Sequence, residues 1–240
     1  MLSRDNLEKF TKLQQTSVQN VVREYCQHLF LSYLYQNPGS EKLFFKGGTA
    51  LRIILKSPRF SEDLDFTGSG ITHKEIEELF TDTLANIEKT GMAVNVEDAA
   101  ETTGGYLGIA MFEAYDMKIR VQIEVSLRRA KAFKKIRALI ASDYIPAYTL
   151  VHLPIEDIIQ GKLEALADRH KPRDFYDYFF LLSGDYHSAR TKENLKQALK
   201  LLQKETVNFQ AELKKFLPAS QAMHLRDFKN VLEQKILGYL

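Results

Sequence analysis

Apolar residues recur every three or four positions over residues 3–36, first at Leu7, Phe10 and Leu13 and then again from Val18 onward. This spacing is typical of an amphipathic helix and predicts two helical segments. The sequence Asn37-Pro38-Gly39 ends the second segment, because proline and glycine both interrupt helices. The chain therefore opens with helices rather than with the strands that follow them.

Residues 40–126 carry shorter apolar or alternating runs, which predict strands. The predicted strands are 43–45, 63–66, 92–96, 106–114 and 118–126. The last two are joined by Tyr115-Asp116 and read as a hairpin. A helix is predicted from Gly48 to Ser57-Pro58, and another from Thr72 to about residue 89, because Thr72 and Glu75 have the spacing of a capping box.

After Pro146 the pattern becomes almost continuously helical. Helices are predicted to start at Pro154 and Pro172, and two more amphipathic helices are predicted at about 191–214 and 219–237. The sequence therefore predicts an α+β protein. Residues 1–146 form an α/β module with N-terminal helices and a mixed β-sheet, and residues 147–240 form a helical module that completes a cleft.

The composition adds few constraints. The chain has 240 residues, of which 45% are hydrophobic and 27% are charged, enough to bury a substantial core. No apolar run reaches 18 residues, so we expect no membrane contact. The N-terminus lacks the apolar core of a secretion signal, and Cys26 is the single cysteine, so we expect a cytoplasmic protein. The net charge is only +2, but six basic residues lie within 128–137. They form either a solvated face or a contact for a phosphate backbone.

Two acidic residues lie two positions apart in the strand predicted at 63–66. Because successive strand side chains point to opposite faces, Asp63 and Asp65 share a face and can converge on one metal ion. Upstream, the Gly47-Gly48 turn opens a helix, where unsatisfied backbone N–H groups and the helix dipole favour phosphate oxygens. Glu124, near the end of an alternating strand, is a candidate third acidic ligand. For each carboxylate taken alone, a plain solvent-facing strand residue is the alternative.

The residue types limit the chemistry. Carboxylates without paired histidines or cysteines favour a hard cation such as Mg²⁺, which is completed by substrate phosphates, and they disfavour zinc. The Gly-Gly turn lacks the Gly-Lys-Ser/Thr of a Walker A loop, and the chain lacks G-x-G-x-x-G. In a two-metal site, metal ions assist both the attacking hydroxyl and the leaving pyrophosphate. Lys162, on an otherwise apolar helix, is either a cation for phosphate or a lysine that extends its ammonium to the rim of the module.

Two motifs in fixed order also carry a resemblance. The first joins Gly47-Gly48-Thr49-Ala50-Leu51 to Arg59-Phe60-Ser61-Glu62-Asp63-Leu64-Asp65-Phe66, and the second joins Gly161-Lys162 to Arg169 and to Arg173-Asp174-x-x-Asp177. Together they resemble the AbiEii/MenT nucleotidyltransferase-like toxin family, over roughly residues 40–182. The resemblance implies a DNA-polymerase-β-type nucleotidyltransferase fold. It also implies a toxin of a toxin–antitoxin pair, which transfers NMP from NTP to an RNA acceptor such as tRNA and releases pyrophosphate.

Site residues follow from the resemblance by position. The triphosphate would be lined by Gly47, Gly48, Thr49 and Ser61, and two Mg²⁺ ions would be bound by Asp63 and Asp65. Lys162 would bind phosphate. Asp177 would orient Lys162 or the acceptor, and Asp174 is a weaker candidate for that last role. The implied partners are NTP, an RNA acceptor and a cognate antitoxin protein. Glu124 departs from the family pattern, in which the third acidic residue is commonly aspartate.

Two other functions are compatible with the same residues. The chain can retain the fold and act only as a nucleotide-binding or antitoxin-binding module. Alternatively, it can transfer a nucleotide to a small molecule, such as an aminoglycoside-like hydroxyl, because the metal chemistry is the same.

Overall fold

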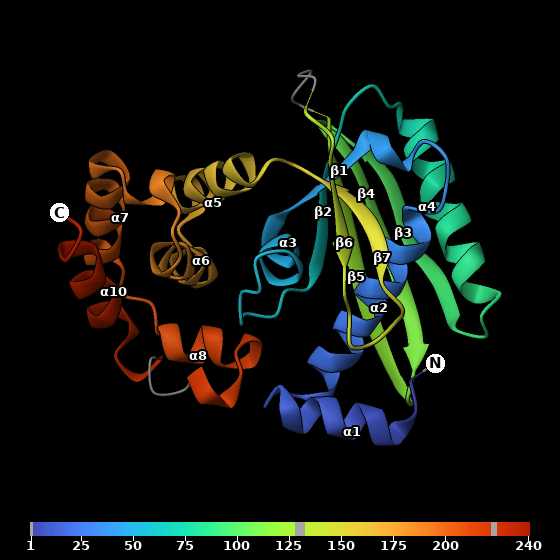
Figure 1. The fold of residues 1–240 in the computed structure, drawn as a ribbon, viewed down its shortest axis with the longest axis horizontal. Helices are drawn as coiled ribbons and strands as arrows, with labels where there is room; N and C mark the ends of the chain where they lie inside the picture. The colour runs from blue at the N-terminus through green and yellow to red at the C-terminus, as the bar shows by residue number, and fades with distance from the viewer. Residues whose placement is uncertain (1, 128–132, 222–224) are drawn as a thin grey trace. The chain divides into compact units, whose positions relative to one another are not determined.

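The computed structural model describes residues 2–127, 133–221 and 225–240 (Figure 1). The chain packs into two compact units, which are described separately. The first consists of Met1–Lys56 and Phe60–Pro154, and the second of Ser57–Arg59 and Ile155–Leu240. The three-residue segment Ser57–Arg59 therefore packs with helices that lie about a hundred residues later in the chain.

The first unit is built on a seven-stranded mixed sheet. Its strands are β1 (Leu43–Lys46), β2 (Asp63–Gly68), β3 (Ala93–Thr102), β4 (Gly105–Ala114), β5 (Met117–Ser126), β6 (Ile136–Ile140) and β7 (Tyr148–His152). They are ordered β3-β4-β5-β2-β1-β7-β6. The β2–β5 and β1–β7 pairs are parallel, and the other neighbours are antiparallel. The prediction of a mixed sheet is confirmed.

Four helices accompany this sheet: α1 (Arg4–Leu13), α2 (Val18–Leu34), α3 (Gly47–Ile53) and α4 (His73–Glu88). α2 and α4 pack against each other and against the sheet, with Phe30 and Phe80 in ring contact between them. The short α3 lies against β1 and β2. At the start of α4, Thr72 and Glu75 form the predicted capping box, and Glu75 also pairs with Lys42.

The alternation of β5 separates the two faces of the sheet. Ile119, Val121, Ile123 and Val125 are buried, whereas the residues between them are half-buried or exposed. Their apolar side chains supply the core beneath the helices, because α2 packs against β5. The opposite face of β2 and β5 is left polar, and the predicted carboxylates lie there.

Two strands were not expected from the sequence. β6 falls in the segment whose basic residues suggested a solvated face, and β7 falls in the part that was read as helical. Both are short, and β7 pairs with β1 on one side and with β6 on the other, so it belongs to the sheet of the first unit. β3 also continues to Thr102, beyond the predicted end at residue 96.

The second unit is helical, as predicted. It contains α5 (Ile155–Arg169), α6 (Pro172–Ser183), α7 (Lys192–Lys204), α8 (Phe209–Leu213) and α10 (Phe228–Leu237), with short 3₁₀ turns between them. An aromatic cluster of α6, α8 and α10 forms its core, in which Tyr176 stacks on Phe228. Phe175, Tyr176 and Tyr178 of α6 are buried and belong to this core.

The helix predicted at 191–214 is wrong in its extent. α7 ends at Lys204, and Asn208 starts α8 by accepting a hydrogen bond from the Ala211 amide. An asparagine that caps a new helix competes with helix continuation, which explains the break. Similarly, the predicted 219–237 helix is a 3₁₀ turn at Ala219–Gln221 followed by α10. Within the described residues, no helix is long and apolar enough to cross a bilayer.

Candidate active site

The polar face of the sheet brings three charged side chains into one row. Asp65 of β2 is the register partner of Lys46 on β1 and of Glu124 on β5. Neighbouring strands lie about 4.8 Å apart, and partners in register project from the same face. The row therefore places an ammonium group on one side of Asp65 and a second carboxylate on the other. Asp63 lies two residues before Asp65, on the same face of β2.

Gly47 permits Asp65 to sit against the start of α3. The glycine has a φ of +83°, and a Cβ added there would lie 1.9 Å from Asp65 Oδ2. Both the backbone conformation and the contact exclude a larger residue. The predicted glycine turn and the predicted metal-binding strand are thus in direct contact, with the Asp65 carboxylate against the backbone of the turn.

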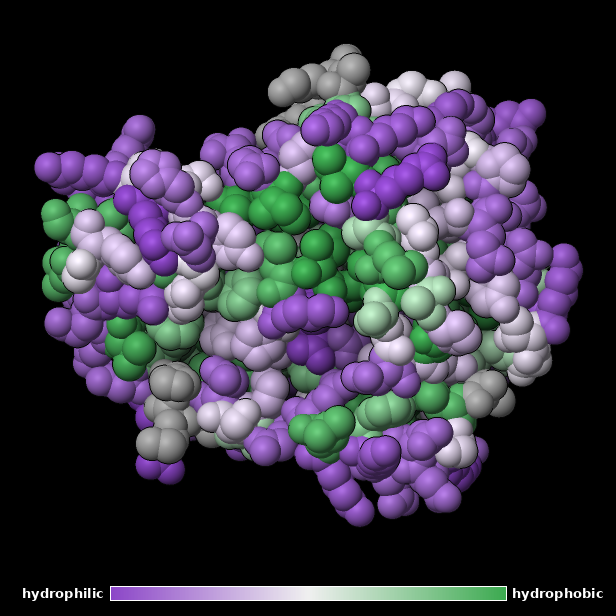
Figure 2. Space-filling model, viewed as in Figure 1, coloured by the Kyte–Doolittle hydropathy of each residue, from purple (hydrophilic) through white to green (hydrophobic). Residues whose placement is uncertain are grey.

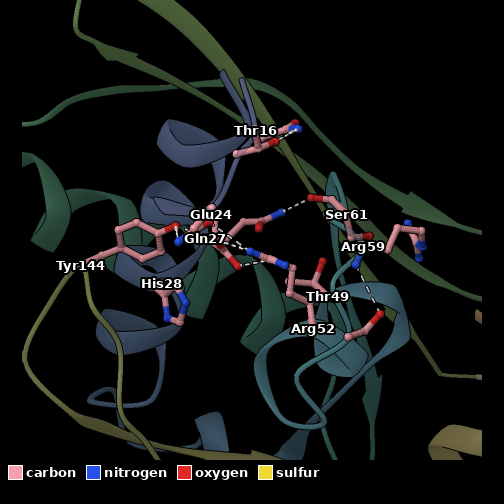
Figure 3. Close-up of polar contacts among 12 residues, drawn as sticks. Thr16, Glu24, Gln27, His28, Thr49, Arg52, Arg59, Ser61 and Tyr144 are labelled. Carbon is pink, nitrogen blue, oxygen red and sulfur yellow. Dashed lines mark hydrogen bonds and ion pairs between the residues drawn. The ribbon is translucent and has the colours of Figure 1, made fainter. Parts of the chain in front are cut away.

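The residues around the turn are held by buried hydrogen bonds. Thr49 is 1% exposed, and its hydroxyl donates to the main-chain carbonyl of Asp63. Gln27 of α2 donates to the main-chain carbonyl of Ser61 at 3.0 Å, as Figure 3 shows. In this structure Thr49 fixes β2 to α3 through its hydroxyl, and Gln27 fixes the approach to β2.

A buried polar network holds the far end of α3 (Figure 3). The Arg52 guanidinium donates through two nitrogens to the Glu24 carboxylate, with the Nη2–Oε2 distance at 3.0 Å. Glu24 also accepts from the Tyr144 hydroxyl at 2.7 Å, and Arg52 donates to Gln14 at 3.2 Å. The guanidinium lies 3.6 Å from the centre of the Phe60 ring. The helix that begins with the glycine turn is therefore anchored to α2 and to residue 144.

The polar row borders a cavity of about 410 Å³ within the first unit. Lys46, Asp65 and Glu124 line it, together with Thr102, Gly104 and Ser126 at the ends of β3, β4 and β5. Its volume lies in the range of small-molecule sites, and its lining combines charged groups with hydroxyls and a glycine backbone. The cavity has the chemistry of a site for a charged, oxygen-rich ligand.

The donor set fits Mg²⁺ better than zinc. Asp63, Asp65 and Glu124 offer only carboxylate oxygens, which hard cations prefer. In this structure Glu124 is exposed and accepts a hydrogen bond from Gln122 at 2.5 Å, and Gln122 accepts one from Arg120 at 3.1 Å. Among the described residues, no three Asp, Glu, His or Cys side chains converge on one point, but Mg²⁺ commonly takes only one or two carboxylates and is completed by waters and substrate phosphates.

Two residues of this site were not identified from the sequence. Lys46 directly precedes the glycine turn, and its place at the end of a strand that pairs with β2 could have drawn attention to it. Gln27 has no local signal, because its role depends on a contact with a residue 34 positions away.

The second unit holds the other two predicted site residues. Lys162 of α5 lies 2.9 Å from Asp177 Oδ2, and Arg59 binds the same carboxylate in a bidentate manner at 2.7 and 2.9 Å. All three are buried. Burial raises the pKa of Asp177, but Arg59 and Lys162 outweigh this effect and hold its pKa below the usual value. The carboxylate is therefore ionised and shared between two cations.

Asp177 is therefore committed to Arg59 and Lys162, while Asp174 is bound by Arg169 at 2.8 and 3.0 Å. Asp174 is 1% exposed and also accepts from the Lys171 amide, which fixes the start of α6. The structure thus separates the two aspartates that the sequence left side by side. Asp174 caps a helix, and Asp177 holds a cation.

A match to a sequence model of a protein family decides the family of the chain. The family model of the AbiEii nucleotidyl transferase toxins of type IV toxin–antitoxin systems matches residues 29–236. The chain belongs to the AbiEii family. The predictions of this family and of a nucleotidyltransferase are confirmed, and the match reaches well beyond residues 40–182, where the resemblance was noted.

Solved structures share the fold of this AbiEii-family chain. The crystal structure of JHP933 from Helicobacter pylori is similar with a TM-score of 0.65 and 21% identity, over 93% of both chains. A second H. pylori protein, to which nucleotidyltransferase activity is ascribed, is similar with a TM-score of 0.58 and 20% identity, over 93% of this chain and 99% of the other. No curated protein matches the chain.

The basic segment predicted at 128–137 is described only in part for this AbiEii-family chain. Arg128, Arg129 and Lys131 lie outside the described residues. Lys135 pairs with Glu41 at 3.8 Å, and Arg137 is exposed on β6. The proposed contact with a phosphate backbone at this segment stays a prediction.

Proposed function

We propose that this AbiEii-family protein transfers NMP from an NTP to a hydroxyl of an RNA acceptor, in the class of tRNA, and releases pyrophosphate in a Mg²⁺-dependent reaction. The observation that carries the proposal is the row Lys46, Asp65 and Glu124, with Gly47 packed against Asp65. Lys46, Asp65 and Glu124 border one cavity there, and Gly47 lies against Asp65. Each suits a different part of a metal-bound triphosphate.

The carboxylates of the row supply the metal ligands. Asp63 and Asp65, with Glu124, would hold Mg²⁺, which supplies charge stabilisation at the phosphate oxygens when bound. Gly47 and Gly48 leave backbone amides next to Asp65, and Ser61 adds a hydroxyl before β2, so these three would contact the triphosphate. Thr49 would act by holding β2 in place, since its hydroxyl is bonded to Asp63.

Lys162 and Asp177 are proposed as the contribution of the helical unit. Lys162 would donate to substrate phosphate, and Asp177 would orient it from 2.9 Å away. Because Arg59 balances the Asp177 charge, the Lys162 ammonium is held without being fully neutralised by its partner. The family match further supports a cognate antitoxin as a partner. With NTP and tRNA as the proposed substrates, the cytoplasm is the proposed location of the reaction.

The reaction is tested by incubating the purified protein with each labelled NTP, Mg²⁺ and total tRNA. We expect labelled RNA and pyrophosphate, and a loss of at least about 100-fold in rate for Asp65→Asn, which keeps the shape and removes the charge. Transfer that is unaffected by Asp65→Asn would refute the assignment of the site. Tight NTP binding without transfer to any RNA would favour a binding module instead.

Lys46 allows a second test with a matched control. Lys46→Met removes the cation of the row, so the Kd for NTP should rise about tenfold, while Lys46→Arg should retain most of the affinity. Lys42→Met is the control, because Lys42 pairs with Glu75 and does not line the cavity. Titration calorimetry measures the Kd for NTP of each variant. Equal losses for Lys46→Met and Lys42→Met would contradict the role given to the row.

A further inference from the structure

Four lysines of α7 form a regular stripe in the second unit. They are Lys192, Lys196, Lys200 and Lys204, spaced four residues apart along the helix. Residues four apart are neighbours on a helix surface, and each step advances about 6 Å along the axis. All four side chains are exposed, and hydrophilic side chains are prominent over α7 in Figure 2. We call this set the lysine stripe.

The opposite side of α7 explains why the lysines face outward. Leu195, Ala198 and Leu202 are buried against the rest of the helical unit, where α7 packs on α5 and α10. The end of the helix is held by Lys229, whose ammonium donates to the carbonyls of Gln203 and Glu205. The helix is thus fixed by its apolar side, and the lysine stripe is not needed to attach it.

Within α7, Lys204 alone of the stripe has a favourable place, because it lies in the last turn near the negative end of the helix dipole. Like charges four residues apart repel each other, and Lys192, in the first turn, opposes the positive end of the helix dipole. No carboxylate among the described residues pairs with any of the four lysines, and Glu193 is the one acidic residue within α7. A row of mutually repelling cations that no carboxylate of the described residues pairs with is better explained by an anionic partner outside the chain.

We propose that the lysine stripe binds the phosphodiester backbone of the RNA acceptor. Successive ammonium groups about 6 Å apart match the repeat of phosphates along one strand, and lysine contacts of this kind are independent of sequence. Flexible lysines suit a backbone that presents point charges. The inference rests on the proposed RNA acceptor and names the surface that holds it.

Binding of fluorescent tRNA is measured by anisotropy at several salt concentrations for the intact chain and for K192Q/K196Q/K200Q/K204Q. Each lost phosphate contact lowers the slope of log K against log salt by about 0.7 to 0.9, so we expect the slope to fall by about 3 and the affinity at least about tenfold. K9Q/K12Q/K74Q/K89Q is the matched control, because it removes the same charge from exposed lysines of the first unit. It should bind tRNA like the intact chain.

The possible outcomes separate this inference from the proposed reaction. Equal losses of tRNA affinity in both quadruple variants, or no loss of affinity in the stripe variant, would overturn the inference. Binding of polyglutamate through the stripe without binding of tRNA would also overturn it and indicate an acidic protein partner. Stripe-dependent tRNA binding without nucleotide transfer from any NTP would support the inference and reject the reaction.

If transfer occurs, the stripe variant should raise the KM for tRNA about tenfold and leave kcat within about twofold.

Discussion

Asp177 illustrates how one buried charge depends on its neighbours. Its side chain is 1% exposed and faces Arg59 and Lys162, which are themselves 3% and 9% exposed. One carboxylate therefore separates two buried cations. Removal of a buried charge costs more than the bonds it made, since the partners that remain are left desolvated and uncompensated.

We expect Asp177→Asn to lower the free energy of unfolding by about 3 to 5 kcal/mol, because Arg59 and Lys162 would then repel each other in a buried site. Guanidinium unfolding measures the loss. Asp185→Asn is the control, since Asp185 is fully exposed and pairs with Arg190 at 3.3 Å, so this variant should lose far less stability than Asp177→Asn. Adding Lys162→Met to Asp177→Asn should restore part of the stability, and a purely additive double variant would contradict the explanation.

Only some residues of the candidate site could be predicted from the sequence. Asp63, Asp65 and the Gly47-Gly48 turn were identified because their spacing within one strand or turn determines their geometry. Glu124 was a candidate because its strand alternates, but its register with Asp65, like that of Lys46, comes from strand pairing, which has no local signal. Arg59 lies within a recognised motif, but its partner Asp177 is 118 residues away, so neither periodicity nor spacing could pair them.

At the scale of elements, α3 is short and depends on contacts at both ends. Its seven residues are too few for a stable isolated helix. Thr49 ties its first turn to β2, and Arg52 ties its last turn to Glu24 of α2. α2 thereby positions the glycine turn without lining the cavity, and it does so through the same polar side that carries Gln27.

We expect Arg52→Met to lower the free energy of unfolding by about 3 kcal/mol, because it leaves the buried Glu24 carboxylate without its cation. It should also weaken NTP binding about tenfold through displacement of α3. Tyr148→Phe is the control, because it removes a hydrogen bond of 2.8 Å to His28, and among the described residues Tyr148 has no hydrogen bond to α3. Calorimetric titration of folded protein distinguishes them, and an unchanged Kd for Arg52→Met would exclude a positioning role.

The elements that were predicted correctly have strong local patterns. α1, α2 and α4 have clear helical periodicity, and the β4–β5 hairpin joins a long apolar run in β4 to a strictly alternating β5. β7 was missed because it has only five residues, of which all but Thr149 are buried, and so short a run cannot be distinguished from a helix by its apolar content. α7 and α8 were merged because the intervening residues do not include proline or glycine.

At the scale of the whole molecule, stability should depend on pH through His28. Burial lowers the pKa of His28 to about 4, from an ordinary value of about 6.5, so the imidazole is neutral when folded. Between these values the unfolded chain binds more protons than the folded chain. Stability contributed by the neutral imidazole is therefore present above about pH 6.5 and is lost as the pH falls towards 4.

Lowering the pH from 7 to 5 should cost about 2 kcal/mol through this residue, as calculated from the two pKa values. Urea unfolding at both pH values measures the change. His28→Gln removes the titrating group. Between pH 7 and pH 5 the free energy of unfolding of this variant should therefore fall by less than that of the intact chain, and the difference should be about this amount. An identical loss in the two proteins would show that His28 does not control the acid response.

The placement of Ser57–Arg59 within the helical unit has a consequence for synthesis of the chain on the ribosome. Arg59 is translated 118 residues before Asp177, which corresponds to roughly ten seconds at ordinary rates of elongation. During that interval the nascent first unit carries the segment that leads into β2 without the carboxylate that later fixes it. Fixation of the segment that leads into β2 should therefore wait until translation passes α6, and a chain truncated before α6 would lack it.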